Sequence, residues 1–138
     1  MKDHEYWMDK AISQAKLSDT PYGAVVVNRD DDFIKAYNTV ATDGATAHAE
    51  MNALYKLQEL NYEEAKNLTL YTTVEPCPMC MSAVVWAGIG TVVYGASIDD
   101  AAQFGNQIFI SSDEVVRQSW YDLALVKGIE RDNCMQLF

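Results

Sequence analysis

Apolar positions recur along the chain with two periods, one typical of helices and one typical of strands. Residues 7–15 place apolar side chains at helical spacing and polar ones on the other face, which predicts an amphipathic helix. Residues 23–27 and 33–37 are two short runs separated by a turn rich in aspartate, and they predict a hairpin. The chain is therefore expected to begin with one helix and two strands.

The central part alternates helical and strand patterns. Thr46 is a candidate N-cap for a helix that runs to about residue 60. Residues 68–74 and 90–94 predict strands, and residues 78–87 predict a helix that begins with proline. Such alternation favours a parallel sheet covered by helices on both faces, so the predicted fold class is α/β. The buried stripe of the first of these helices is expected to hold Met51, Leu54, Leu57 and Leu60.

The last third of the chain gives weaker signals. Residues 101–110 fit neither period, residues 113–121 are compatible with a helix, residues 123–126 predict a strand and residues 130–138 a helix. No internal repeat, low-complexity tract or flexible linker divides the sequence. We therefore expect a single domain over residues 1–138.

The charge and the cysteines narrow the range of partners and compartments. With 20 acidic and 10 basic side chains the formal net charge is −10, and such a field disfavours a nucleic-acid partner. Three cysteines, two of them three residues apart, do not resemble a secreted disulfide framework. The N-terminus lacks a signal pattern, and the most apolar stretch, residues 83–94, is too short to span a bilayer. These features predict a cytoplasmic protein without a membrane segment.

His48, Cys77 and Cys80 are the best candidates for a cluster of metal ligands, because one imidazole and two thiolates suit zinc. Cys77 and Cys80 share one face of a predicted helix start. His48 lies 29 residues before Cys77, at the start of another predicted helix. The fold must therefore bring two helix starts together.

Three grouped ligands predict a catalytic rather than a structural zinc site, since structural sites are normally closed by four protein ligands. His4 and Cys134 are poor candidates for a fourth ligand: His4 precedes the first helix, and a single cysteine in the last helix is more often a small apolar residue. An open position holds water, whose pKa zinc lowers from about 15.7 to about 7. Glu50, two residues after His48, can carry a proton from that water to a leaving amine. A redox pair of cysteines would not account for His48 and Glu50.

Two segments, TAHAE at 46–50 and EPCPMC at 75–80, resemble the H-x-E and P-C-x-x-C signature of the cytidine-deaminase-like superfamily of zinc-dependent deaminases. The likeness extends over roughly residues 5–105. Within the superfamily the chain is similar to bacterial guanine deaminases and tRNA adenosine deaminases, which share the Cys-Pro-Met-Cys turn. The resemblance implies a three-layer α/β/α sandwich with a central mixed five-stranded sheet, assembled as a homodimer. It also implies one zinc per chain and a proton-shuttling role for Glu50.

The resemblance further implies substrate contacts from Asn38, Ala49 and Trp86. The Asn38 amide can donate and accept together, as recognition of a purine edge requires, although it could equally be an ordinary turn asparagine. Trp86 matches an aromatic residue of guanine deaminases, and its alternative is a place in the core. The roles of Phe104, Phe109 and the C-terminal segment stay open.

Two departures from the guanine deaminases bear on the substrate. Residues 104–109 lack the acidic pair that those enzymes carry there, and residues 127–138 look more like the ending of the tRNA enzymes. The favoured hypothesis is hydrolytic deamination of a free purine-type base or nucleoside, with guanine or guanosine first. The alternatives are a tRNA adenosine (wobble) deaminase, a cytosine or cytidine deaminase, and a non-catalytic zinc-binding subunit.

The sequence offers one discriminating feature for each of two alternatives. A tRNA partner needs cations along the backbone path and usually a basic terminal helix. Here Lys127 and Arg131 stand among acidic residues, which favours the small-molecule substrate. The intact Glu50 argues against a non-catalytic subunit.

Overall fold

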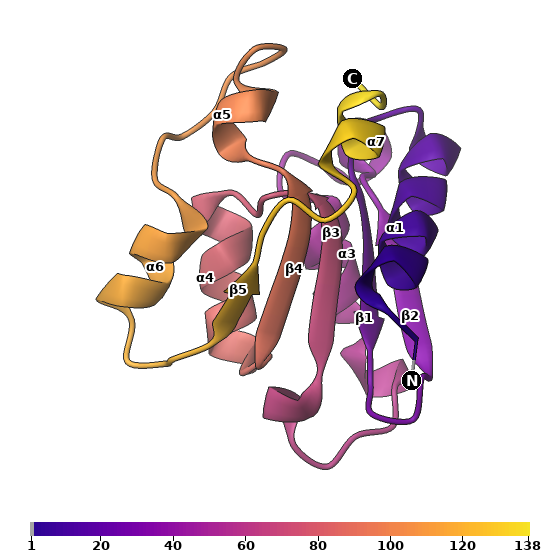
Figure 1. The fold of residues 1–138 in the computed structure, drawn as a ribbon, viewed down its shortest axis with the longest axis vertical. Helices are drawn as coiled ribbons and strands as arrows, with labels where there is room; N and C mark the ends of the chain where they lie inside the picture. The colour runs from indigo at the N-terminus through magenta and orange to yellow at the C-terminus, as the bar shows by residue number, and fades with distance from the viewer. Residues whose placement is uncertain (1) are drawn as a thin grey trace.

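The computed structural model describes residues 2–138 and has a five-stranded sheet at its centre (Figure 1). The strand order is β2-β1-β3-β4-β5. The first strand pairs antiparallel with the second and third, whereas β3 with β4 and β4 with β5 are parallel. The sheet is therefore mixed, which confirms the mixed five-stranded sheet that the resemblance implied: β3, β4 and β5 are parallel, as the alternation favours, and the N-terminal hairpin adds antiparallel pairs. The strands are β1 (Gly23–Val27), β2 (Phe33–Tyr37), β3 (Thr69–Val74), β4 (Thr91–Ala96) and β5 (Ala124–Val126).

Helices cover both faces of this sheet, with α1 and α7 on one face and α3, α4 and α6 on the other (Figure 1). This arrangement confirms the three-layer α/β/α sandwich. The helices are α1 (His4–Ser18), α2 (Val40–Asp43), α3 (Ala49–Tyr55), α4 (Pro78–Ala87), α5 (Ile98–Ala101), α6 (Ser112–Gln118) and α7 (Arg131–Met135), with 3₁₀ turns at Leu57–Glu59 and Ala65–Asn67.

The inner strands β1, β3 and β4 are buried at successive positions because helices cover both faces of the sheet there, whereas exposed and buried positions alternate on the edge strand β2. On β1, Ala24 and Val26 pack into the cluster under α3 and α4, whereas Val25 and Val27 pack into the cluster under α1. At the start of β1 a Cβ on Gly23 would lie 2.0 Å from the carbonyl oxygen of Ala11. Glycine there lets α1 pack directly on the strand.

The helix after β2 is shorter than predicted. It begins at Ala49 with His48 as N-cap, because Thr46 lies in a turn in which the His48 amide donates to the Thr46 carbonyl at 2.8 Å. It ends at Tyr55, where a 3₁₀ turn follows. The predicted buried stripe of this helix is also wrong in part. Leu60 is buried, but Met51, Leu54 and Leu57 are only half-buried. The residues that α3 does bury are Ala49, Glu50 and Ala53.

The C-terminal third follows the sequence prediction with shorter bounds. The helix predicted over 113–121 is α6, the strand predicted over 123–126 is β5, and the helix predicted over 130–138 is α7. The ambiguous stretch 101–110 is irregular after the last residue of α5. Neither α2 nor α5 was predicted, because each spans only four residues.

An ion pair joins α5 to α7. The Arg131 guanidinium donates to the two carboxylate oxygens of Asp100 at 2.7 and 2.9 Å. The Asp100 carboxylate also accepts from the backbone amide of Ser97 at 3.0 Å. The hydrogen bonds from Arg131 lower the pKa of Asp100 to about 2.

Asp100→Asn is therefore expected to lower the free energy of unfolding by about 1 kcal/mol at neutral pH, a value reduced for solvent screening of the half-exposed Arg131. Because the folded pKa lies below the unfolded one, this stabilisation is present above about pH 4 and is lost as the pH falls towards 2. Denaturant unfolding at several pH values measures it, with the exposed neighbour Asp99→Asn as the control. A difference from wild type that did not shrink on acidification would contradict the prediction.

Candidate active site

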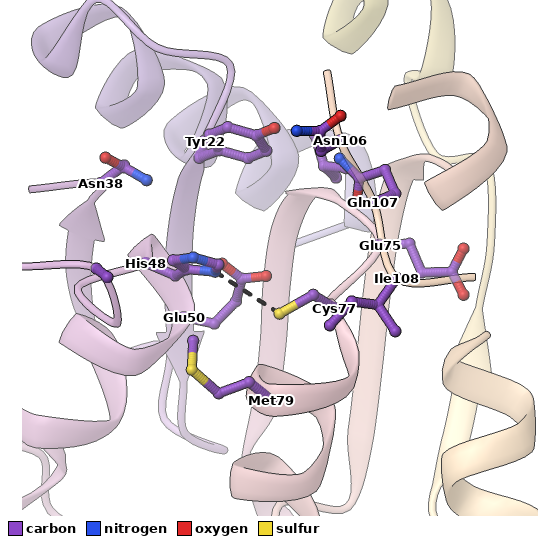
Figure 2. Close-up of a pocket in the computed structure, with 12 residues that line it drawn as sticks. Tyr22, Asn38, His48, Glu50, Glu75, Cys77, Met79, Asn106, Gln107 and Ile108 are labelled. Atoms are coloured by element: carbon purple, nitrogen blue, oxygen red, sulfur yellow. Dashed lines mark hydrogen bonds between the residues drawn. The ribbon is translucent and has the colours of Figure 1, made fainter. Parts of the chain in front are cut away.

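The starts of two helices converge at one point beside the sheet. His48 is the N-cap of α3, Cys77 is the N-cap of α4, and Cys80 lies in the first turn of α4. The Nδ1 atom of His48 is 3.7 Å from the Cys77 Sγ (Figure 2). The same Nδ1 atom is 3.5 Å from the Cys80 Sγ. The three ligand atoms lie within 4.8 Å of one another, which confirms that the fold brings the two helix starts together.

The start of α4 is marked by Pro78, which occupies its first turn, where proline is favoured. Neither His48 nor Cys77 uses its side chain to cap its helix. The side chains at these N-cap positions are therefore available to a metal ion. On the other side of the site, Asn52 of α3 donates to the Tyr37 carbonyl at 2.8 Å and to the Thr39 hydroxyl at 2.9 Å. These bonds hold the end of β2 against α3.

The donor set fits a zinc ion. One imidazole and two cysteine sulfurs are typical of zinc sites, and three protein ligands leave one position for water or substrate. Hydrogen bonds from Cys80 and His48 lower the pKa of the Cys77 thiol, which favours the thiolate form that binds metal. The two residues that the sequence made poor fourth ligands lie away from this cluster. Cys134 is a buried residue of α7, on the opposite face of the sheet. The His4 ring hydrogen-bonds the Tyr71 hydroxyl at 2.8 Å.

Glu50 lies beside the His48 ring in the first turn of α3 (Figure 2). Its side chain lines a cavity but is only 5% exposed. Burial raises the pKa of Glu50 to about 7. Near neutral pH this carboxyl group can therefore both accept and release a proton, as a general acid and base requires.

The cavity above the metal ligands has a volume of about 410 Å³. Its polar wall consists of Tyr22, which precedes β1, Asn38, which follows β2, and two amides, Asn106 and Gln107, from the segment between α5 and α6 (Figure 2). Sequence reasoning did not assign Tyr22, Asn106 or Gln107 to the site. Tyr22 stood in the matched stretch before β1, whereas residues 106 and 107 lie in a segment that gave no periodic signal.

Asn38 lines the cavity, but only one end of its amide faces it. The Asn38 side-chain oxygen accepts a hydrogen bond from the Val40 amide at 3.1 Å. Figure 2 shows the amide nitrogen on the side of the cavity. The side chain therefore offers a donor to a substrate, rather than the donor and acceptor together that the sequence suggested.

The two other residues expected to contact substrate do not present side chains to this cavity. The Ala49 side chain is fully buried in the core between the sheet and α3. Trp86 is 76% exposed on α4 and packs on Trp120, with ring centroids 4.6 Å apart, beside a separate groove. Of the two open cases, Phe104 stacks on Phe138 and Phe109 is exposed.

An α/β/α sandwich with three zinc-type ligands and a buried carboxyl group beside them defines a zinc-dependent hydrolase. The chain belongs to the family described as the cytidine and deoxycytidylate deaminase zinc-binding region, whose model matches residues 1–96. It is therefore a zinc-dependent aminohydrolase of the nucleobase and nucleoside deaminase type.

Relatives with two different substrates resemble the chain. It is 36% identical over 110 residues to the guanine deaminase of Bacillus subtilis, which covers 75% of this chain and 70% of that protein. It is 31% identical over 140 aligned positions to the tRNA-specific adenosine deaminase of the same organism, which covers 97% and 85%. The solved structure of the guanine deaminase from Nitrosomonas europaea has a TM-score of 0.76 at 24% identity over 97% of this chain and 79% of that chain, which shows a shared fold.

None of the helices within residues 2–138 is both long enough and apolar enough to cross a bilayer.

Proposed function

We propose that the protein hydrolytically deaminates a free purine-type nucleobase or nucleoside, with guanine or guanosine preferred. The cavity carries this proposal: two of the zinc ligands, Glu50 and three amide side chains line one space, and no lysine or arginine is among its lining residues. A phosphorylated substrate would bring negative charge beside Glu50 without a compensating cation. An unphosphorylated, hydrogen-bonding substrate suits this lining.

In the proposed reaction the oxygen of water bonds to the amine-bearing carbon of the base, the carbon–nitrogen bond breaks, and ammonia leaves. His48, Cys77 and Cys80 would hold the zinc ion, which would supply the Lewis acid that makes water a nucleophile at neutral pH. Glu50 accepts the proton of that water and delivers protons to a ring nitrogen and then to the leaving amine. The amide nitrogen of Asn38 donates to an acceptor on the base and thereby orients it.

The alternative is deamination of a wobble adenosine in tRNA, which the extent of the match to the tRNA-specific relative supports. The surface charge argues against it. Near the C-terminus Lys127 pairs with Asp113, and Arg131 pairs with Asp100. These cations are already neutralised, and a phosphate backbone requires cations along its path.

An ammonia-release screen tests the proposed function. The panel contains guanine, guanosine, adenine, adenosine, cytosine, cytidine, related triazines and an anticodon stem-loop, and Glu50→Gln protein gives the background. We expect guanine or guanosine to react fastest. Faster deamination of the stem-loop than of every free base and nucleoside at physiological salt would favour the tRNA alternative.

The homodimer implied by the resemblance stays a prediction, which light scattering of the purified protein checks.

Asn38→Ala is expected to raise the KM for the base by about tenfold, because it removes one hydrogen-bond donor to substrate. Alanine also removes the acceptor for the Val40 amide, so Asn38→Ser serves as the matched variant: its hydroxyl can cap that turn without supplying the amide donor. Steady-state kinetics of both variants measure the effect. If the serine variant has a wild-type KM, the Asn38 amide does not contact substrate.

A further inference from the structure

A single buried carboxylate holds both ends of the segment that forms one wall of the cavity. Glu75 is 7% exposed. Its Oε1 atom accepts from the Ile98 amide at 3.0 Å, and its Oε2 atom accepts from the Ser112 amide at 2.8 Å and the Ser112 hydroxyl at 2.6 Å. Ile98 is the first residue of α5 and Ser112 the first of α6. Both ends of the segment 98–112 are therefore hydrogen-bonded to the same side chain, that of Glu75.

Between these ends α5 is also tied to α7 by the ion pair of Asp100 with Arg131, but the part of the segment that follows α5 has few other attachments to the fold. Its residues 103–106 and 108–110 are exposed, and its backbone bonds are local, from the Phe104 amide to Ala101 at 3.0 Å and from the Ile110 amide to Ile108 at 2.9 Å. One ring contact joins it to the C-terminus, where Phe104 stacks on Phe138 with centroids 4.9 Å apart. A segment of this kind takes its position largely from where its ends are held.

This segment nevertheless supplies part of the polar wall of the cavity. Asn106 and Gln107 face the space above His48 and Glu50 (Figure 2). The Gln107 side chain also lies near the Tyr22 hydroxyl and favours its ionised form, which lowers the pKa of Tyr22, although burial raises that pKa overall. The position of these two amides in the wall therefore depends on how the segment that carries them is held.

The carboxylate of Glu75 does not itself serve the chemistry. Figure 2 shows it pointing away from His48 and Glu50, towards the side where α5 and α6 begin. The Glu75 amide donates to the Ala96 carbonyl at 2.7 Å, which fixes the residue where β3 and β4 end. We propose that Glu75 is a positioning residue for substrate binding, acting through residues 98–112. The choice of substrate used in its test rests on the proposed function.

Glu75→Gln is the sharpest test, because it preserves the shape of the side chain while replacing one acceptor oxygen by a donor. All three partners of Glu75 are donors, so the new NH₂ group must face an N–H or O–H group. At least one charge-assisted hydrogen bond is lost and one end of the segment is released. The ligands His48, Cys77 and Cys80 keep their donor atoms.

The kinetic arm compares wild type, Glu75→Gln and the matched control Glu114→Gln, a half-buried glutamate whose carboxylate bonds its neighbours Arg117 and Gln118 within α6. With guanine as substrate, or the most reactive member of the panel if guanine is inert, Glu75→Gln is expected to raise KM about tenfold. We expect kcat to stay within about twofold and zinc per chain to stay unchanged. The control is expected to match wild type in all three. Loss of zinc with a lower kcat and an unchanged KM would show instead that Glu75 supports only the Cys77 turn.

The second arm needs no substrate. Chymotrypsin cleaves after aromatic residues, and Phe104 and Phe109 are exposed within the segment. Under native conditions, cleavage at these two sites is expected to be faster in Glu75→Gln than in wild type or Glu114→Gln. Equal cleavage rates would overturn the inference. If wild type deaminates no member of the panel, the proposed function is contradicted, and this arm still decides whether Glu75 positions the segment.

Ser112→Ala keeps the inference testable if Glu75→Gln does not fold. It removes one of the three donors and leaves the carboxylate and both amide bonds in place. We expect a smaller rise in KM and a smaller increase in cleavage, both in the same direction. In the double variant, KM is expected to equal that of Glu75→Gln, because both changes act on one contact. A wild-type KM and cleavage rate in Ser112→Ala, or a double variant with independent, multiplied effects, would argue against the shared contact.

Discussion

Glu50→Gln is expected to lower kcat by about two to four orders of magnitude while leaving zinc content and fold unchanged. Glutamine is nearly isosteric with glutamate but cannot take up and release a proton. Glu50 is not one of the three clustered ligands, so the metal centre is expected to form without its carboxylate. Ammonia release, elemental analysis and circular dichroism measure the three properties, and Glu50→Ala is expected to behave similarly.

The control is Glu59→Gln, an exposed glutamate in the 3₁₀ turn after α3. It is expected to keep wild-type kcat. Near-normal turnover in either Glu50 variant would reassign Glu50 as a buried structural residue rather than the proton shuttle.

Cys80→Ala is expected to reduce bound zinc from about one per chain to a small fraction and to abolish activity. Cys80 is fully buried in the first turn of α4, and its loss leaves only one ligand from each of the two helices. Because metal binding contributes to folding stability, the melting temperature is expected to fall as well. Elemental analysis and thermal unfolding of the purified variant measure both effects.

The chain offers a matched control in Cys134→Ala, which removes an equally buried cysteine on the opposite face of the sheet. This variant is expected to lose some packing but to keep its zinc and its kcat. A Cys80→Ala protein that binds zinc as wild type does would remove the basis for the metal centre.

Elements with strong local signals could be predicted from the sequence, and elements set by tertiary contacts could not. The bounds of β1 and β2 agree with the prediction, and α4 begins at Pro78 and ends at Ala87 as expected, because proline and glycine mark its limits. The N-cap of α3 was placed two residues too early, since Thr46 has the chemistry of a cap but lies in a turn. The antiparallel pairing of β1 with β3 joins strands far apart in sequence and has no local signal.

The residues of the candidate site also fall into those that local motifs could predict and those that tertiary contacts place. His48, Glu50, Cys77 and Cys80 were found because they lie in two short motifs whose spacing carries the chemistry. The amides of residues 106 and 107 escaped notice because their segment is irregular. They reach the cavity only through contacts such as those of Glu75, which the sequence places in the cysteine motif without indicating its partners.

The three hydrogen bonds that Glu75 accepts from the ends of residues 98–112 also bear on how new specificities arise in this fold. A segment that begins and ends at one point can change in length or composition without displacing the sheet or the metal ligands, and doubling the length of a flexible loop costs only about 0.6 kcal/mol. Exchange of residues 102–111 between homologous enzymes is thus expected to transfer substrate preference while the hydrolytic machinery stays intact. The metal ligands and Glu50 lie on α3 and α4, whereas part of the recognition wall lies on a separate segment, and this separation lets one part change without the other.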